Sequence, residues 1–105
     1  MAREKFKTLT EPMYYILLAL FEERRGIDIM DVVQQISEKR VSVGPGTLYA
    51  MLQKFEDNDI IVTTRTDGRQ KWYIITERGK QMLLGEMERQ RQMLQAGEHE
   101  LSKKQ

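Results

Sequence analysis

The stretch IIVTTRTDGRQKWYII, residues 60–75, decides the fold of this chain. Two runs of β-branched and aromatic residues, 60–65 and 71–75, flank the segment TDGRQ at 66–70, whose Asp-Gly pair adopts left-handed backbone at little cost. The pattern predicts a β-hairpin. Because an isolated hairpin is only marginally stable in water, we expect it to pack against the helices that precede it.

Three short helices are predicted before the hairpin. The first begins at Thr10-Glu11-Pro12, where Thr suits the N-cap, and ends near Arg24-Arg25-Gly26, where cations and a glycine suit a C-terminus. The second begins at Asp28 and runs to about Arg40. The third begins at Gly44-Pro45-Gly46-Thr47. Its inward stripe consists of Leu48, Met51, Leu52 and Phe55.

A long fourth helix is predicted after the hairpin, starting at Thr76-Glu77 and reaching about Leu101, with a frayed end at Ser102 to Gln105. Its seam advances by alternating steps of four and three. The seam residues are Leu83, Met87, Gln90, Leu94, Gly97 and Leu101. We therefore expect a domain over residues 1–76 and a helical segment with its tail over residues 77–105.

Length and composition limit the function. A chain of 105 residues with 40% hydrophobic residues supports one small globular domain. Its 17 basic and 16 acidic residues leave a net charge of +1, so any basic site must be local. The absence of cysteine and of a signal-peptide pattern favours a cytoplasmic protein, and the longest apolar run, residues 16–21, is far too short to span a membrane.

The order of elements predicts a mainly α fold with a β-hairpin, namely a winged helix-turn-helix followed by a C-terminal helix. The third helix is then the recognition helix, with its polar side facing a DNA major groove. This outward side carries Thr47, Ala50, Gln53 and Lys54, with Tyr49 at its flank.

Two local signals point toward nucleic acid. The glycines at Gly44 and Gly46 expose backbone N–H groups that suit a phosphate, although they also suit a simple tight turn. The hairpin carries Arg65, Arg69 and Lys71 against the single acid Asp67, which suits salt-sensitive DNA contacts or merely a solvated loop. A third basic cluster, Arg3, Lys5 and Lys7, is interpreted as a solvated terminus rather than a DNA-contacting arm.

Three segments resemble the PadR family of bacterial transcriptional regulators: LTEPMYYILLAL at 9–20, VGPGTLY at 43–49 and WYIITERG at 72–79. The resemblance implies a winged helix-turn-helix that dimerises through its C-terminal helix. It also implies a repressor released by a small, often aromatic or phenolic effector. Thr47 and Tyr49 would then contact DNA, Arg69 and Lys71 its backbone, and Tyr15 a phosphate.

The chain departs from the family pattern in three places. Arg25-Gly26-Ile27-Asp28-Ile29 stands where a His-Gly-Tyr-Glu-Ile-like stretch is common, Gly44 stands where serine is usual, and the C-terminal helix has no tryptophan. Binding of a flat drug between paired helices is therefore not expected. Together the residues and the resemblance give a predicted DNA-binding set of Tyr15, Ser42, Gly44, Gly46, Thr47, Tyr49, Gln53, Lys54, Arg65, Arg69 and Lys71.

A homodimer is expected, because one recognition helix reads only a few base pairs. The predicted interface combines the first-helix flank with the seam of the last helix, although that helix could instead fold back on its own core. Interface residues are Tyr14, Leu18, Leu83, Met87, Leu94 and Leu101. Trp72, Met82 and Met87 are candidates for an effector pocket, but the methionines could simply fill the interface, and Trp72 could stack on the wing, a partner or a ligand.

No catalytic, cofactor or metal site is predicted. His99 is the only histidine, and carboxylate pairs such as Glu86 and Glu88 lie on polar faces. The competing hypothesis to a DNA-binding regulator is a dimeric winged-helix adaptor that binds protein and does not read DNA. Such an adaptor would need neither the glycine-rich helix entry nor the basic hairpin tip.

Overall fold

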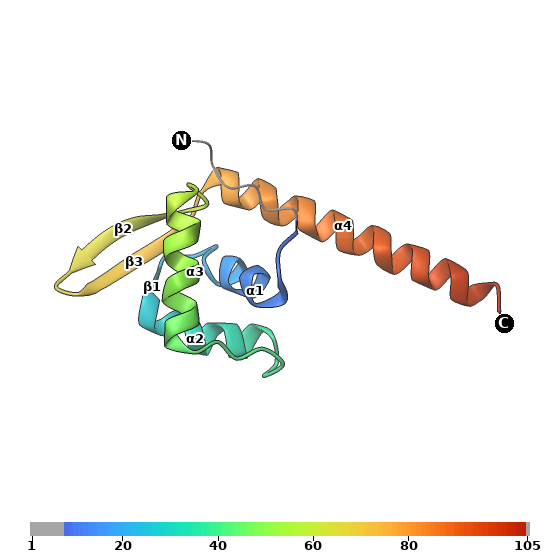
Figure 1. The fold of residues 1–105 in the computed structure, drawn as a ribbon, viewed down its shortest axis with the longest axis horizontal. Coiled ribbons are helices and arrows are strands. Elements are labelled where there is room, and N and C mark those ends of the chain that lie inside the picture. Colours follow the sequence, from blue (N-terminus) through green and yellow to red (C-terminus); the bar gives the residue numbers. More distant parts are fainter. Residues whose placement is uncertain (1–7, 105) are drawn as a thin grey trace.

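The computed structural model describes residues 8–104, which form a helical body with a protruding hairpin on one side and a long helix on the other (Figure 1). The basic cluster Arg3, Lys5 and Lys7 and the terminal Gln105 lie outside the described residues. The elements in chain order are α1 (Glu11–Ala19), β1 (Arg24–Arg25), α2 (Gly26–Ile36), α3 (Pro45–Asp57), β2 (Ile61–Asp67), β3 (Gln70–Ile75) and α4 (Glu77–Ser102). The predicted helices and hairpin are thus confirmed.

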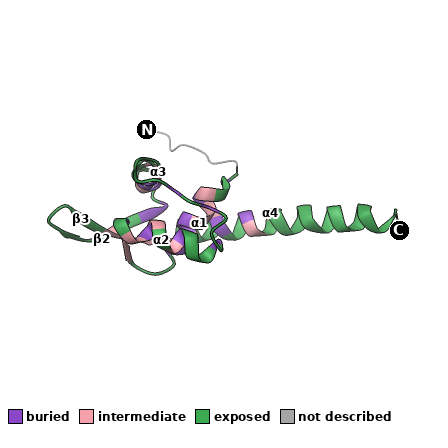
Figure 2. Cartoon of the chain, turned by 90° about the horizontal axis from the view of Figure 1, so that it is seen from below, coloured by how far each residue is buried: buried purple, intermediate pink, exposed green. Residues whose placement is uncertain are grey.

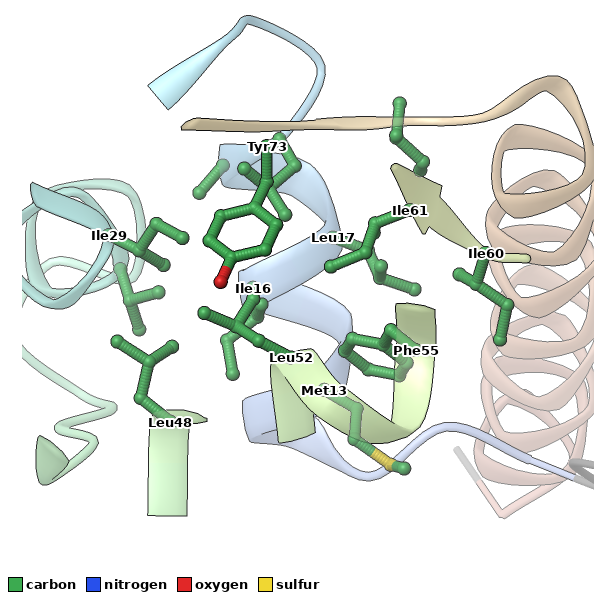
Figure 3. Close-up of a cluster of buried hydrophobic side chains, with 14 of the residues drawn as sticks. Met13, Ile16, Leu17, Ile29, Leu48, Leu52, Phe55, Ile60, Ile61 and Tyr73 are labelled. Atoms are coloured by element: carbon green, nitrogen blue, oxygen red, sulfur yellow. The ribbon is translucent and has the colours of Figure 1, made fainter. Parts of the chain in front are cut away.

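The core forms around α1, whose Ile16 and Leu17 are completely buried. Residues of α2, α3, the sheet and α4 surround them, and Figure 3 shows the ring of Tyr73 among these aliphatic side chains. On α3 the inward stripe is nearly as predicted: Leu48, Leu52 and Phe55 are fully buried, whereas Met51 is half-buried. The buried stripe of α3 leaves the opposite face of that helix to solvent.

Threonine caps fix the starts of two helices, as predicted. The Oγ of Thr10 accepts a hydrogen bond from the N–H of Met13 at 3.3 Å, and the Oγ of Thr76 accepts one from Gly79 at 3.1 Å. The Thr76 hydroxyl also lies 2.9 Å from the carbonyl of Ile60, to which it donates. This second contact anchors the start of α4 to the end of the connection that follows α3.

The first helix ends earlier than the sequence predicted. It stops at Ala19, and Arg24 and Arg25 form strand β1, which pairs antiparallel with Tyr73 and Trp72 of β3. Arg24 nevertheless serves the helix C-terminus, because its Nε donates to the carbonyl of Ala19 at 2.6 Å. The pairing with β3 could not be read locally, since it joins residues almost fifty positions apart.

The second helix also differs from its prediction at both ends. It begins directly at Gly26 with Arg25 at the N-cap, so Asp28 lies within the first turn instead of capping it. It ends at Ile36 rather than near Arg40, because Glu38 and Lys39 both take positive φ angles, 55° and 67°, that terminate the helix.

The hairpin strands are longer than predicted, and the loop between them is only Gly68 and Arg69. Gly68 has φ 62°, as expected at the first loop position of a type II′ turn. In the three-stranded sheet, β3 lies between β1 and β2. Only the base of the hairpin packs on the body, and the tip is exposed on both strands (Figure 2).

Helix α4 is anchored only through its first turns, then projects away from the body (Figures 1 and 2). Leu83 is 0% exposed within the core of its own chain, which corrects its predicted place on an open interface seam. All residues from 90 to 104 are exposed. Within the part of the chain that the structure describes, no helix is long and apolar enough to cross a membrane.

Candidate nucleic-acid interface

A groove of about 350 Å³ lies between the start of α2, the exposed side of α3 and the hairpin. Four of its lining residues were predicted to contact DNA: Tyr49, Gln53, Arg69 and Lys71. The other lining residues are Arg25, Gly26, Ile27, Gln70 and Tyr73. The described lining contains three cations and no carboxylate, and only Arg25 among the three is paired with a nearby acid, Asp28, so the groove suits an anionic ligand.

The start of α3 adds an exposed polar surface beside this groove. Ser42, Gly44, Gly46 and Thr47 are all exposed, and the Oγ of Ser42 accepts a hydrogen bond from Gln34 at 3.3 Å. A Cβ atom on Gly44 or Gly46 would meet nothing within 4 Å. The packing of the chain therefore does not require glycine at these positions. With glycine there, the backbone at the start of α3 is accessible to a ligand.

Gln53 and Lys54 lie in the middle of α3. The Nε2 of Gln53 donates to the Oδ1 of Asp57 at 2.8 Å, which holds the amide along the helix surface. Lys54 is half-buried and does not line the groove. Tyr15 is further removed. It lies on α1, where its ring meets that of Tyr14 edge to face at 5.6 Å between centroids.

Arg65 lies on the hairpin against Trp72 rather than in the groove. Its guanidinium carbon is 3.9 Å from the centroid of the Trp72 ring, a cation–π contact. A bulge between Thr63 and Arg65 shifts the register so that Arg65 faces Trp72 across the two strands. Of the three environments considered for Trp72, the structure shows the one on the wing.

Arg25 is the one charged residue in the described lining of the groove that was not among the predicted DNA-binding residues. Its Nε and one terminal nitrogen donate to the two carboxylate oxygens of Asp28 at 2.9 and 3.2 Å, and its other terminal nitrogen donates to Gln70 at 3.3 Å. The hydrogen bond from Arg25 lowers the pKa of Asp28 below its ordinary value. Local pattern assigned Arg25 to a helix end; only pairing with β3 brings it beside the hairpin tip.

Two tyrosines, Tyr49 and Tyr73, line the groove. Tyr73 is buried, and its burial, followed by the negative charge of Glu56 and the nearby Tyr49, raises its pKa above the ordinary value. Tyr49 is 46% exposed and leans on the first turn of α2. A Cβ on Gly26 would lie only 3.0 Å from Cε1 of that ring, so glycine permits this close approach.

A comparison of the sequence with family models shows the family to which this chain belongs. The model of the transcriptional regulator PadR-like family matches residues 16–84, which run from the second half of α1 through α2, α3 and the hairpin into the start of α4. The chain belongs to the PadR-like family of transcriptional regulators. Members of this family are regulators and not enzymes. No curated protein matches the sequence.

Solved structures share the fold of this PadR-like chain. A PadR-like transcription factor from Bacteroides fragilis is 28% identical, with a TM-score of 0.65 over 87% of this chain and 91% of its own. RosR from H. salinarum is 20% identical, with a TM-score of 0.67 over 91% and 97%. A transcriptional regulator from Clostridium thermocellum is 19% identical, with a TM-score of 0.70 over 82% and 88%.

The interface residues predicted for the PadR-like chain fall into three environments. Leu83 is in the core, whereas Tyr14, Leu18 and Met87 are half-buried. Burial, then the neighbouring Tyr15 and the charge of Glu86 on α4, raises the pKa of Tyr14. The outer seam residues Leu94 and Leu101 are 63% and 66% exposed. Only the outer half of the predicted seam is therefore fully open to a partner.

Of the three candidate effector residues, one lines a cavity described among residues 8–104. Met82 lines a space of about 210 Å³ beside Thr8, Leu9, Gln81, Gly85, Glu86 and Arg89. Trp72 and Met87 are absent from the described lining of that space, and Trp72 is covered by Arg65. Neither the groove nor this cavity therefore contains more than one of Trp72, Met82 and Met87 in its described lining.

Proposed function

We propose that this PadR-like protein is a sequence-specific regulator that binds double-stranded DNA, with α3 in the major groove and the hairpin as a wing on the sugar-phosphate backbone. One observation carries the proposal: α3 and the wing share a groove lined by Arg69 and Lys71, and the only other cation of its described lining, Arg25, is paired with Asp28. In a chain of net charge +1, this local excess of positive charge is the feature that would attract phosphate.

The exposed start of α3 supports the same orientation. Thr47 and Tyr49 stand on the open side of the helix, next to glycines that allow another backbone to come close. The first turn of α3 presents backbone N–H groups that would bind a phosphate oxygen. Gln53, one turn further on, would approach base edges after releasing its bond to Asp57.

The proposal includes a homodimer. The outer part of α4 carries Met93, Leu94 and Leu101, each more than half exposed, along a helix that projects beyond the body. A second copy lying against this face would cover them. Pairing would also place two α3 helices on successive major grooves, about 34 Å apart, which gives useful specificity to a short recognition helix.

The proposal extends to regulation. As the family resemblance implies, we propose repression of the target promoter, relieved when a small aromatic or phenolic effector binds. Titrating the protein–operator complex with a panel of simple phenols tests this step. Loss of operator binding at equal salt supports relief by such an effector, and an unchanged affinity across the panel contradicts it.

The central experiment is a salt titration of binding to the DNA upstream of the protein's own gene, with a random duplex as competitor. We expect tight, salt-dependent binding with a large ratio of specific to random affinity. Weak and equal binding to both duplexes contradicts sequence reading and favours the adaptor function instead.

Two double variants locate the DNA-binding surface on the protein. Arg69→Ala with Lys71→Ala should lower the magnitude of the salt slope by about 0.9 for each phosphate that the wing no longer neutralises. The control, Lys80→Ala with Lys104→Ala, removes the same charge from α4 and the C-terminal end, and the slope should stay as in the parent. A slope that is unchanged in the first variant would show that the wing does not lie on DNA.

A further inference from the structure

The junction between β1 and α2 contacts both walls of the DNA-binding groove. On one side, Gly26 lies against the ring of Tyr49 on α3, so closely that an added Cβ would be 3.0 Å from it. On the other side, Arg25 donates to Gln70 at the base of the wing tip. Two adjacent residues therefore connect the recognition helix with the wing.

The guanidinium of Arg25, which donates the hydrogen bond to Gln70, is itself held in a fixed orientation. Asp28 holds the guanidinium by two hydrogen bonds, a fork that fixes the plane of the group. The backbone of Arg25 is fixed as well, since β1 pairs Arg25 with Trp72 of β3. The remaining terminal nitrogen of Arg25 does not bond Asp28, and it donates to Gln70.

The tip of the wing needs such a support, because it has little packing of its own to hold it in place. Residues 64–71 are exposed on both strands, and the loop ends in Gly68 and Arg69. An exposed two-stranded tip is intrinsically mobile. Arg69 and Lys71, which flank Gln70 directly, move with it.

The charge of Arg25 is balanced, unlike that of its neighbours in the groove. The carboxylate of Asp28 neutralises Arg25, and the pair is oriented within the protein. By contrast, Arg69 and Lys71 have no ion-pair partner among the described residues. Geometry and charge both separate Arg25 from the cations expected to bind phosphate.

We propose that Arg25 is a positioning residue, which with Asp28 and Gln70 fixes the wing at a set distance from the recognition helix. The effect of this positioning on DNA binding rests on the proposed function, because the position of the wing would then set how Arg69 and Lys71 contact the DNA backbone. The position of the wing in the free protein, however, is measurable without any DNA. Arg25 thus acts on binding through geometry rather than through its charge.

The test measures that position directly. The chain has no cysteine, so Thr66→Cys on the wing and Gln35→Cys on α2 can be spin-labelled specifically, and the distance distribution measured by pulsed electron resonance without DNA. We expect one narrow distribution in the parent. It should broaden in Arg25→Gln and Gln70→Leu, and also in Arg25→Lys, whose ammonium keeps the charge but cannot form the fork.

Gln70→Glu is the matched control for the label experiment. It keeps an acceptor for Arg25, so the distribution should stay narrow. Gln70 is exposed and Arg25 is half-buried, so these substitutions should change the unfolding temperature little. An unfolding temperature close to that of the parent would confirm that each variant folds. Equal widths in the parent, Arg25→Gln and Gln70→Leu would overturn the positioning role, whether or not the protein binds DNA.

DNA binding separates positioning from direct contact. Arg25→Gln and Gln70→Leu should each weaken operator binding by about three- to tenfold, the effect of one hydrogen bond, with an unchanged salt slope. A slope reduced by about 0.9 in Arg25→Gln alone would show that Arg25 itself binds phosphate and would overturn the proposal. A parent that fails to bind DNA refutes the proposed function, while the label distances still decide the role of Arg25.

Discussion

The two halves of α4 are one continuous helix in very different surroundings. In the first half, Gly79, Leu83 and Glu86 are buried against the body. In the second half every residue is exposed, including Leu94 and Leu101 of the same apolar seam. Helical periodicity thus defines a face without saying what covers it. The first half is covered by its own chain, and we propose that the second is covered by another copy.

The strongest way to break the anchored half is Gly79→Ala. A Cβ at this position would lie 2.3 Å from the carbonyl oxygen of Ile60, and backbone cannot move aside cheaply. We expect a loss of unfolding free energy of about 4 kcal/mol or more, beyond the usual cost of overpacking. Gly85→Ala is the control on the same helix, since nothing lies within 4 Å of its added Cβ. Chemical denaturation measures both, and equal stability would contradict the tight contact at Gly79.

Leu83→Ala tests the same anchor by removing volume. Leu83 is fully buried, whereas its neighbour Leu84 is 51% exposed. The unfolding free energy should fall by about 3 kcal/mol for Leu83→Ala and by less than about 0.5 kcal/mol for Leu84→Ala. Urea denaturation of the two variants compares buried and exposed leucine directly. Similar losses in both would place Leu83 outside the core.

The outer half is tested by charge rather than by volume. Leu94→Asp with Leu101→Asp should raise the dissociation constant of the proposed dimer by about a hundredfold or more, because carboxylates replace leucines in the seam that pairing would bury. Gln92→Asp with His99→Asp carries the same number of new carboxylates on the opposite face of the helix, and should stay dimeric. Sedimentation at several concentrations measures both; a dimer that persists in the first variant refutes this interface.

Glu86 marks the boundary between the halves and gives a smaller, pH-dependent effect. Its pKa is lowered, first by the hydrogen bond from Arg89, and further by bonds from Gln90 and the Leu9 N–H. A lowered folded-state pKa contributes stability that is present above the ordinary value of 4.5 and is lost as the pH falls through the folded value. Acid titration of the unfolding free energy should therefore be steeper in the parent than in Glu86→Gln.

At neutral pH Glu86→Gln should cost about 1 to 2 kcal/mol, because an amide cannot accept from Arg89 at both positions. The control is Glu88→Gln, which loses an exposed pair with Arg91 worth less than about 0.5 kcal/mol. Identical acid profiles in the parent and Glu86→Gln would assign the acid sensitivity to other carboxylates.

Much of the fold could be predicted because its signals are local. Thr10 and Thr76 cap helices by contacts within one turn, and the spacing of Leu48, Leu52 and Phe55 fixes the buried side of α3. The hairpin followed from β-branched runs around Asp67 and Gly68 in the same way. The caps and the helical stripe depend on steps of three or four positions, and the hairpin depends on the continuous stretch 60–75.

The groove was predicted only in part. Tyr49, Gln53, Arg69 and Lys71 were expected from the third helix and the hairpin tip, and the structure gathers them around one groove. Arg25 was missed and Arg65 is directed onto Trp72, because both depend on strand register. Register is set by pairing across the whole sheet, and a bulge of one residue changes which side chains meet.

The sequence by itself determined the order of the four helices and the hairpin, the threonine caps of α1 and α4, the buried face of α3 and the family. Tertiary structure alone decided that Leu83 belongs to the core while Leu94 does not, and that Arg25 reaches Gln70, 45 positions away in the chain. The physical reason is range. Helix and turn preferences act between neighbours along the chain, whereas burial and register depend on which distant segments pack together.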